Sequence, residues 1–258
     1  MDITIVTIVY NGVHEIEKTI KSVLAQKNSN VEYVIIDGNS NDGTLDVINK
    51  YKDKIDVIIS EKDNGIADAF NKGIQHASGD YIALINCGDT LEPNVLEGIR
   101  SVKEYSDVIY GDCIVHDVRN DRFYKKKAMD IDKMQYFLPF SHQACFVSKK
   151  AYEKYGLYES EYKICMDYAL IRKMYAQEAK FTYIEIPMAC FSTEGISYRK
   201  PIDTMIENMR IACHYGLPLY KATSYGTFHV LRYYIKKLLE KLGLFKFVVR
   251  FKNKKYKY

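Results

Sequence analysis

The six cysteines of the 258-residue chain include no Cys-x-x-Cys pair, so the sequence lacks the usual framework of a zinc site or a set of disulfides. No uninterrupted apolar run approaches the roughly 20 residues that a membrane-spanning helix needs. The chain runs from Met1 directly into an apolar stretch, without the basic and apolar regions of a signal peptide. These absences lead us to expect a cytoplasmic protein with buried, reduced thiols.

Two nucleotide-binding motifs are also missing. The sequence contains no GxxxxGK[ST] phosphate loop, and no GxGxxG follows the first apolar run. These gaps argue against a P-loop NTPase and against a dinucleotide-dependent dehydrogenase. We find no internal repeat and no low-complexity linker either.

The charge is unevenly distributed along the chain. The formal net charge is +4, yet the segment from Phe228 to the C-terminus holds ten Lys or Arg against one acid, Glu240. That tail therefore carries +9, and the preceding 227 residues carry −5. Basic character is thus confined to the tail.

The first hundred residues alternate between two kinds of apolar pattern. Residues 3–9 form a continuous run enriched in β-branched residues, which is typical of a strand buried on both faces, and residues 31–36, 55–59 and 81–85 are the next predicted strands. Helical periodicity covers residues 16–24, 45–51, 66–76 and 95–102. This alternation predicts an α/β fold with a parallel sheet between helices, which binds ligands at the carboxyl ends of its strands.

The alternation becomes looser beyond residue 105. The pattern predicts short strands at 107–110, 113–118, 143–147 and 181–186, and helices at 149–155 and 167–175. After Pro201 the pattern is helical to the end. We therefore expect one catalytic domain with a helical extension that starts near residue 200.

Polar, glycine-bearing loops follow each of the first four predicted strands. They are YNG at 10–12, DGNSNDGT at 37–44, EKDNG at 61–65 and NCGD at 86–89. Any one of them could be ordinary turn chemistry, which uses the same residues. Four such loops on one edge of a parallel sheet instead favour a ligand site. Their carboxylates would suit ribose hydroxyls and a hard cation bridging a diphosphate.

Several segments together resemble one family. TIVTIVYN, SVLAQ, IIDGNSNDGT, DNGIADAFNKGI, ASGDYIALINCGD and MDYALIRKM are similar, in order and spacing, to segments of family 2 glycosyltransferases with the GT-A fold. The nearest resemblance is to bacterial enzymes that build O-antigen, capsule or colanic-acid-type polysaccharides, and it covers residues 1 to about 200.

The resemblance implies a Rossmann-like nucleotide-diphospho-sugar transferase with a mostly parallel sheet flanked by helices. Residues 1–200 would form the catalytic domain, with residues 1–105 binding the nucleotide sugar and 106–200 binding the acceptor. Residues 201–258 would form a helical, basic extension that associates with a membrane.

The resemblance also implies the donor site. Tyr10 and Asp37 lie where the family holds the nucleotide base, and Asp68 lies where it contacts the nucleotide. The other expected donor-site residues are Thr7, Asn11, Gly38, Asn71, Asn86 and Gly88. For Asn71 the alternative is an ordinary position on a helix surface.

The segment NCGD matches the family's metal-binding DxD region but has fewer acids. Asn86 and Gly88 replace two of the acids, which leaves Asp89 as the one carboxylate. A Mg²⁺ or Mn²⁺ ion held by Asp89, donor phosphates and waters is still consistent with this pattern. Asn86 could add a neutral oxygen or simply cap the turn.

The predicted catalytic base is Asp167. An acid at the start of a helix could serve only the helix dipole, but this one matches the family's acidic motif, with Met166 in place of the leading Glu. His142 and Gln143 are expected near the acceptor, although a lone histidine is more often structural. The segment 191–197 could close over the donor or be a plain loop.

The tail combines apolar residues at helical spacing with lysines and arginines. The apolar positions are Phe228, Leu231, Ile235, Leu238, Leu239 and Leu242, and the basic positions are Arg232, Lys236, Lys237 and Lys241. This pattern suits an anionic membrane surface, and the alternative is a helix packed on the protein with a solvated basic end. No motif supports nucleic-acid binding.

These features together predict an inverting, metal-dependent glycosyltransferase with a UDP-sugar donor. The expected acceptor is an undecaprenyl-diphosphate-linked saccharide at the inner face of the bacterial plasma membrane. Alternatives are a non-catalytic sugar-nucleotide-binding or membrane scaffold protein, and a sugar nucleotidyltransferase, which would normally carry a glycine-rich basic loop after the first strand. The sequence leaves open the donor sugar, the acceptor, the linkage, and the oligomeric state, including a homodimer.

Overall fold

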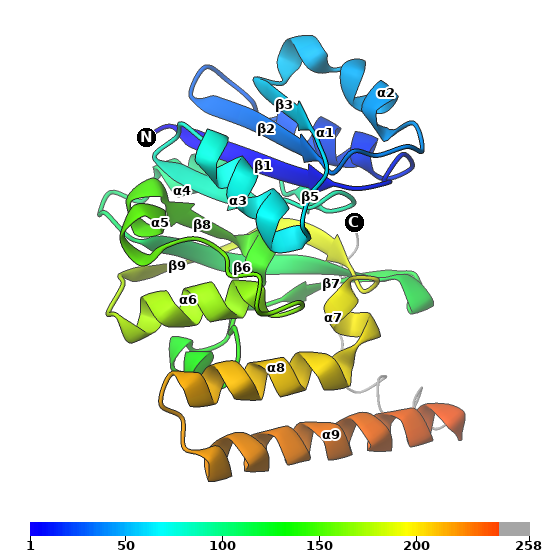
Figure 1. The fold of residues 1–258 in the computed structure, drawn as a ribbon, viewed down its shortest axis with the longest axis vertical. Helices are drawn as coiled ribbons and strands as arrows, with labels where there is room; N and C mark the ends of the chain where they lie inside the picture. Colours follow the sequence, from blue (N-terminus) through cyan, green and yellow to red (C-terminus); the bar gives the residue numbers. More distant parts are fainter. Residues whose placement is uncertain (243–258) are drawn as a thin grey trace.

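The computed structural model describes residues 1–242, and the strands of this part form one nine-stranded mixed sheet. The strand order is β3-β2-β1-β4-β8-β6-β9-β5, and β7 pairs with β6 at the side of this path. Helices cover both faces of the sheet, and the C-terminal helices stack below it (Figure 1). The predicted α/β fold is confirmed. Residues 243–258, which include part of the predicted membrane tail, lie outside the described residues.

The N-terminal half is the predicted parallel sheet. Its strands are β1 (Ile3–Val9), β2 (Val31–Asp37), β3 (Val57–Ser60) and β4 (Tyr81–Leu84), and its connecting helices are α1 (Ile16–Leu24), α2 (Thr44–Asn49), the 3₁₀ turn η1 (Lys52–Lys54) and α3 (Ile66–His76). β1 pairs in parallel with β2 and with β4, and β2 with β3. The loops after these strands therefore reach the same edge of the sheet.

Successive residues of these strands serve two cores. In β1, Ile3 and Ile5 pack with Ile16 and Ile20 of α1, whereas Val6 packs on the opposite face with Phe70 of α3. Since strand side chains alternate between faces, a strand with apolar residues on both faces contributes to both cores.

The second half of the sheet is mixed. It contains β5 (Thr90–Leu91), β6 (Val108–Asp117), β7 (Arg122–Lys126), β8 (Cys145–Ser148) and β9 (Phe181–Ser192). β8 lies between β4 and β6 and is antiparallel to both, and β9 is parallel to β6. The sheet is thus parallel through β4 and mixed beyond it.

Two strands differ in length from the sequence prediction. The segments 107–110 and 113–118 belong to one strand, β6, and β9 continues past Pro187. Pro187 pairs with Asp112 where the β6–β9 register shifts. A proline is tolerated at such a bulge because the ladder hydrogen bonds are already interrupted there.

The remaining helices pack on the sheet and on one another. They are α4 (Val95–Arg100), α5 (Lys149–Tyr155), α6 (Met166–Ala176), α7 (Ile196–Arg199), α8 (Pro201–His214) and α9 (Leu219–Lys241), with 3₁₀ turns η2 (Val118–Asn120), η3 (Ile131–Gln135) and η4 (His142–Ala144). α8 lies between α6 and α9 (Figure 1). Among the helices of residues 1–242, none has the length and apolar character needed to cross a membrane.

Candidate active site

A cavity of about 670 Å³ lies beside the loop that follows β4. Its wall combines that loop with η4, the N-terminus of α6 and the segment from Phe191 to Tyr198. A volume of this size suits a small-molecule substrate. The cavity gathers six of the residues predicted from the sequence, and these are Asn86, Gly88, Asp89, His142, Gln143 and Asp167.

Asp89 is held firmly in the tight turn after β4. Gly88 has φ +93°, a conformation that glycine adopts without strain. The hydroxyl of Thr19 accepts from Gly88 N–H at 3.0 Å and donates to the Asp89 carbonyl at 2.7 Å. On the side chain, Gln143 Nε2 donates to Asp89 Oδ2 at 3.0 Å. Gln143, predicted to lie near the acceptor, thus orients the Asp89 carboxylate.

Burial changes the chemistry of Asp89. The side chain is 9% exposed, and this burial raises its pKa to about 7 although the Gln143 hydrogen bond opposes the shift. A carboxylate that has lost its hydration is stabilised by a nearby cation. Asp89 therefore has the environment of a cation ligand.

Two neighbours of Asp89 add oxygens to this end of the cavity. Asn86 Oδ1 is buried and has no hydrogen-bond partner among the described residues. Glu15, just before α1, approaches so closely that its Oε2 would lie 3.4 Å from a Cβ on Gly88. The sequence did not indicate Glu15, because it belongs to a different loop and is far from the DxD region.

The oxygens of Asp89 and Asn86 fit a cation that takes most of its ligands from the substrate and from water. Within residues 1–242 no three His, Cys, Asp or Glu side chains come together as a metal-binding group. Asp89 and the neutral oxygen of Asn86 could hold Mg²⁺ or Mn²⁺ if substrate phosphates and waters completed the shell. The structure is thus consistent with a cation that binds together with its substrate.

Asp167 lies at the N-terminus of α6, on the cavity wall. Its Oδ1 accepts from the backbone N–H of Tyr168 at 2.8 Å. Burial raises the pKa of Asp167, and nearby His142 opposes this shift. A carboxylate with a raised pKa, held at a cavity wall, is suited to accept a proton.

His142 is buried beside Asp167 and is 9% exposed. Neither ring nitrogen has a hydrogen-bond partner in the described part of the chain, and the ring packs against Phe70 with centroids 5.1 Å apart. Burial lowers the pKa of His142, which favours the neutral ring. A neutral imidazole with unpaired nitrogens in a cavity wall is available to a substrate hydroxyl.

Glu207 of α8 is a supporting residue that sequence reasoning missed. Its carboxylate accepts from the backbone N–H groups of Lys163, Ile164 and Cys165 at 3.0, 2.9 and 2.8 Å. These groups directly precede α6, so Glu207 fixes the segment that carries Asp167. The helical region after residue 200 is therefore tied to the cavity.

The residues predicted to hold the nucleotide lie at the ends of β1 and β2. Among the described residues, the cavity wall does not include Tyr10, Asn11, Asp37 or Gly38. The Tyr10 ring is 66% exposed, so it is free to contact a base. Asn11 instead joins the first two loops, since its side chain accepts from Asn41 N–H and its N–H donates to Ser40.

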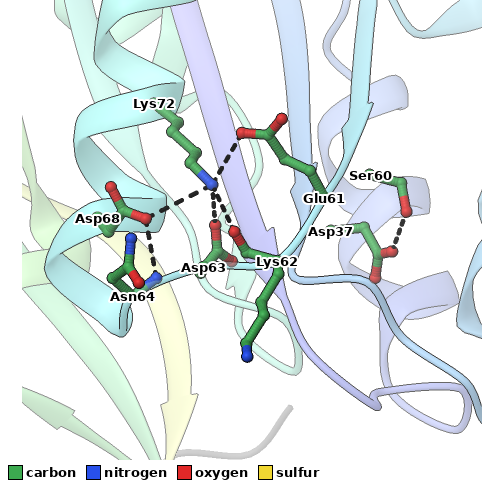
Figure 2. Close-up of polar contacts among 8 residues, drawn as sticks. All are labelled: Asp37, Ser60, Glu61, Lys62, Asp63, Asn64, Asp68 and Lys72. Atoms are coloured by element: carbon green, nitrogen blue, oxygen red, sulfur yellow. Dashed lines mark hydrogen bonds and ion pairs between the residues drawn. The ribbon is translucent and has the colours of Figure 1, made fainter.

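Asp37 is fully buried at the end of β2. Its Oδ2 accepts from the Ser60 hydroxyl at 2.6 Å (Figure 2) and from Ser40 N–H at 3.1 Å, whereas Oδ1 has no partner among residues 1–242. Gly38 lies beneath Tyr10 and Asp63, because a Cβ there would meet Asp63 Oδ2 at 2.8 Å. Contact between Asp37 and a base would require movement of the loop that carries Asp63, which lies against Gly38.

Thr7 does not reach this edge. It is fully buried within β1, and its hydroxyl lies 3.2 Å from the Tyr33 hydroxyl. In this structure Thr7 is a core residue, and the predicted contact with the nucleotide is closed to it.

Asp68 belongs to a charge network centred on Lys72. The Lys72 amine lies 2.9 Å from Glu61, 2.8 Å from Asp63 and 3.5 Å from Asp68, and it donates to the Lys62 carbonyl (Figure 2). These partners raise the pKa of Lys72 well above its ordinary value. Asp68 also accepts from Asn64 N–H at 2.9 Å, which lowers its pKa. Asp68 therefore holds the loop before α3 in place.

Asn71 has a structural role that neither sequence interpretation anticipated. Its Nδ2 donates to the Tyr158 carbonyl at 2.8 Å, and its Oδ1 accepts from Tyr158 N–H at 2.9 Å. The side chain fastens α3 to the segment after α5. Both polar groups of Asn71 are thereby occupied.

Charge within the cavity is mainly negative. The carboxylates of Glu15, Asp89, Asp167 and Glu194 line it, Glu15 is paired with Lys18 of α1, and Lys126 is the lysine of the described wall. An anionic substrate such as a diphosphate would be repelled unless a cation accompanied it.

The sequence profile of glycosyl transferase family 2 matches residues 4–179. A "PGL/p-HBAD biosynthesis glycosyltransferase" of Mycobacterium bovis is 28% identical over 182 residues, which cover 67% of this chain and 70% of that protein. An uncharacterized glycosyltransferase of Mycobacterium tuberculosis is 27% identical over 213 residues, which cover 77% and 78%.

Solved structures of two other proteins share the fold. TarS of S. aureus (residues 1–349) in complex with UDP-GlcNAc has a TM-score of 0.67 at 16% identity, covering 86% of this chain and 69% of that one. The mannosyltransferase PcManGT of Pyrobaculum calidifontis, in complex with GDP-Man and Mn²⁺, has a TM-score of 0.66 at 15% identity, covering 87% and 69%. The matched profile spans more than half of the chain, which therefore belongs to glycosyl transferase family 2.

Proposed function

We propose that this protein is an inverting glycosyltransferase that uses a nucleotide-diphospho-sugar, most simply a UDP-hexose or UDP-N-acetylhexosamine. The observation that carries the proposal is that Asp89 and Asp167, from distant parts of a family 2 chain, line one cavity. One carboxylate would bind the cation of the donor, and the other would accept the proton of the acceptor.

The nucleotide of the donor would lie at the carboxyl edge of β1 and β2. Tyr10 would stack on the base from its exposed position, and Asp37 would contact the base once the loop above it moves. The complexes of TarS with UDP and UDP-GlcNAc support a uridine donor.

The diphosphate of the donor would extend from this edge towards Asp89. Asp89 and Asn86 would hold Mg²⁺ or Mn²⁺ there, and the cation would stabilise the negative charge that develops on the departing diphosphate. The acidic wall supports this arrangement, because a diphosphate entering without a cation would face four carboxylates.

The transfer would be a single displacement at the anomeric carbon. An acceptor oxygen would attack this carbon, the bond to the diphosphate would break, and the nucleoside diphosphate would leave. Asp167 would take the proton from the attacking hydroxyl, a contribution typically worth about 10²–10⁴-fold in rate. His142, neutral and unpaired beside Asp167, would orient the same hydroxyl.

The proposed acceptor is a saccharide linked through a diphosphate to a lipid such as undecaprenol, in bacterial surface polysaccharide synthesis. Helix α9 supports a membrane location because a row of large apolar side chains is exposed along it. These are Leu219, Tyr220, Phe228, Leu231, Tyr234, Ile235, Leu238 and Leu242. Arg232, Lys237 and Lys241 are exposed on the same helix. Such a surface suits the anionic inner leaflet of the plasma membrane.

Vesicle binding tests the membrane location. The protein should sediment with vesicles containing phosphatidylglycerol and much less with vesicles of phosphatidylcholine alone. A variant with Leu231→Ser and Leu238→Ser should lose this binding and keep its affinity for UDP. Equal sedimentation of this variant and the unmodified protein would contradict the role of α9.

A donor panel tests the transfer itself. UDP-sugars would be incubated with a synthetic lipid-diphosphate-sugar and Mn²⁺, and UDP release and product formation would be measured. One donor should give a product whose new anomeric configuration is opposite to that of the donor. Retention of configuration, or no turnover with any nucleotide-sugar despite UDP binding, would contradict the proposal.

A further inference from the structure

Three consecutive lysines at the end of β7 have three different environments. Lys125 pairs with the fully buried Asp112, with 2.7 Å between Nζ and Oδ2. Lys127 pairs with Glu185 at 2.6 Å, and both side chains are largely exposed. Lys126 lies on the cavity wall, and no carboxylate of residues 1–242 lies within 4.0 Å of its Nζ. Lys126 is thus an unneutralised cation in an acidic cavity.

The contacts of Lys126 leave its charge available. Its Nζ donates to the Ser141 hydroxyl over a long 3.4 Å and lies 5.9 Å from the centroid of the Phe191 ring. An ammonium group has three hydrogen-bond donors, so at least two remain for a ligand. A lysine that only stabilised the fold would be expected to pair with an acid, as both of its neighbours do.

Lys126 and Asp89 belong to parts of the cavity wall that several strands of the sheet separate. In the sheet, Lys126 pairs with Cys113, Cys113 pairs with Ala189, and Ala189 pairs with Leu91, just after Asp89. The backbones of Lys126 and Leu91 are thus three strand spacings apart, which is about 14 Å.

The segment Ser141–Gln143 contacts both Lys126 and Asp89. Ser141 contacts Lys126, Gln143 contacts Asp89, and His142 between them lies beside Asp167. The proposed base is therefore associated with the middle of this segment, and Lys126 lies on the side away from the proposed donor diphosphate. A ligand group at Lys126 would belong to the substrate on the acceptor side.

We propose that Lys126 binds a phosphoryl group of the acceptor, in a subsite formed with Ser141 and Phe191. This inference rests on the proposed function and adds the residue that recognises the lipid-diphosphate part of the acceptor. An ammonium group binds a phosphate as a point charge, and the Ser141 hydroxyl, which also lies 3.1 Å from the Cys113 thiol, can donate a second hydrogen bond when it accepts from that thiol. The Lys126 subsite makes the enzyme selective for acceptors that carry an anion near the reacting sugar.

Calorimetric titration with geranyl diphosphate tests the subsite. The protein would first be saturated with UDP and Mn²⁺, so that the probe cannot compete for the donor site. The unmodified protein should bind geranyl diphosphate, and Lys126→Gln should weaken this binding about tenfold or more, as expected for the loss of a charge-assisted hydrogen bond. Geraniol, which lacks the phosphates, should show no difference between the two proteins.

Two further variants make the result specific. Lys126→Arg keeps the charge and should bind the probe within a few-fold of the unmodified protein. Lys127→Gln removes the neighbouring charge outside the cavity and should bind it unchanged. All three variants should keep the UDP affinity and the melting temperature of the unmodified protein.

Several outcomes would overturn the inference. Equal binding of geranyl diphosphate by Lys126→Gln and the unmodified protein would do so, as would no binding of this probe by a protein that binds UDP. Weaker UDP binding by Lys126→Gln would assign the lysine to the donor phosphates instead. A protein that fails to bind UDP at all would contradict the proposed function itself, which separates the two failures.

Discussion

Two polar regions of this molecule differ in how far their groups are already satisfied. At the edge formed by β2, β3 and α3, Lys72 contacts three carboxylates, and Asp68 closes its own loop (Figure 2). In the cavity, Asn86 and His142 have buried atoms without partners in the described chain, and Asp89 has a raised pKa. The contacts of the first region satisfy most of its groups, with Asp37 Oδ1 as a buried atom that has no partner among residues 1–242, whereas the unsatisfied atoms of the second region gather around one cavity.

This contrast distinguishes structural from chemical roles better than residue type does. Both regions are rich in Asp, Asn and Gly, and both follow strands of the same sheet. Buried polar atoms normally find partners, so a group of unsatisfied atoms around one cavity indicates a substrate. The cavity is therefore where we expect bond making and breaking, and the edge is where we expect the nucleotide to be positioned.

The largest expected effect follows from removing the base. Asp167→Asn keeps the shape of the side chain but cannot accept a proton, so the transfer rate should fall about 10²–10⁴-fold. Affinity for UDP should stay within a few-fold of the unmodified protein, because Asp167 is assigned to the acceptor. Steady-state assays with calorimetry would measure both quantities. A fully active variant would refute the assignment of Asp167.

A second experiment compares the lysines of the two regions. Lys72→Met leaves three carboxylates without their cation and should lower the free energy of unfolding by about 1–2 kcal/mol. The melting temperature should then fall by roughly 2–8 °C. Lys126→Met removes no ion pair of the described chain and should leave the melting temperature nearly unchanged. Equal destabilisation by the two substitutions would contradict the distinction between the regions.

The pH dependence provides a smaller effect with a defined sign. Since the folded protein raises the pKa of Asp167, the base is lost as pH falls through a value above the ordinary 3.8. Activity should therefore decline on the acidic side with a midpoint above that value. A profile that stays flat down to pH 4 would contradict the raised pKa.

The same shift predicts a gain in stability for Asp167→Asn. A raised folded-state pKa means that ionised Asp167 destabilises the fold, and this penalty is present when the pH is above that pKa. The variant should melt at a higher temperature than the unmodified protein at pH 8, and the difference should shrink as the pH falls. Thermal melts at several pH values would measure this trend.

Local patterns in the sequence predicted most of the N-terminal half. The apolar run of β1 indicated a strand buried on both faces, and the structure has β1, β2 and β4 at nearly the predicted positions. Parallel pairing placed their loops on one edge. Short motifs also indicated the loop with Asp89 and the helix start with Asp167, which the structure places on one cavity wall, and the roles of both residues stay predictions.

Other parts of the site depend on contacts between residues distant in sequence. Gln143 reaches Asp89 across 54 positions, and Glu207 fixes the segment before Asp167 from a helix expected to be a separate extension. Lys125, Lys126 and Lys127 are consecutive in the sequence, and their different environments follow from the strand register and the packing around it. No local pattern encodes such contacts, so the sequence could not reveal them.

The most direct test of the cavity as the active site is a titration of UDP into the unmodified protein and Asp89→Ala, with and without Mn²⁺. Mn²⁺ should strengthen UDP binding to the unmodified protein by about tenfold or more, and Asp89→Ala should lose most of this gain. The melting temperature of the variant should not decrease, because a buried carboxylate with a raised pKa has been removed. If Asp89→Ala kept the full effect of Mn²⁺, or if the unmodified protein bound UDP equally well without the metal, the assignment of Asp89 as the cation ligand would be wrong.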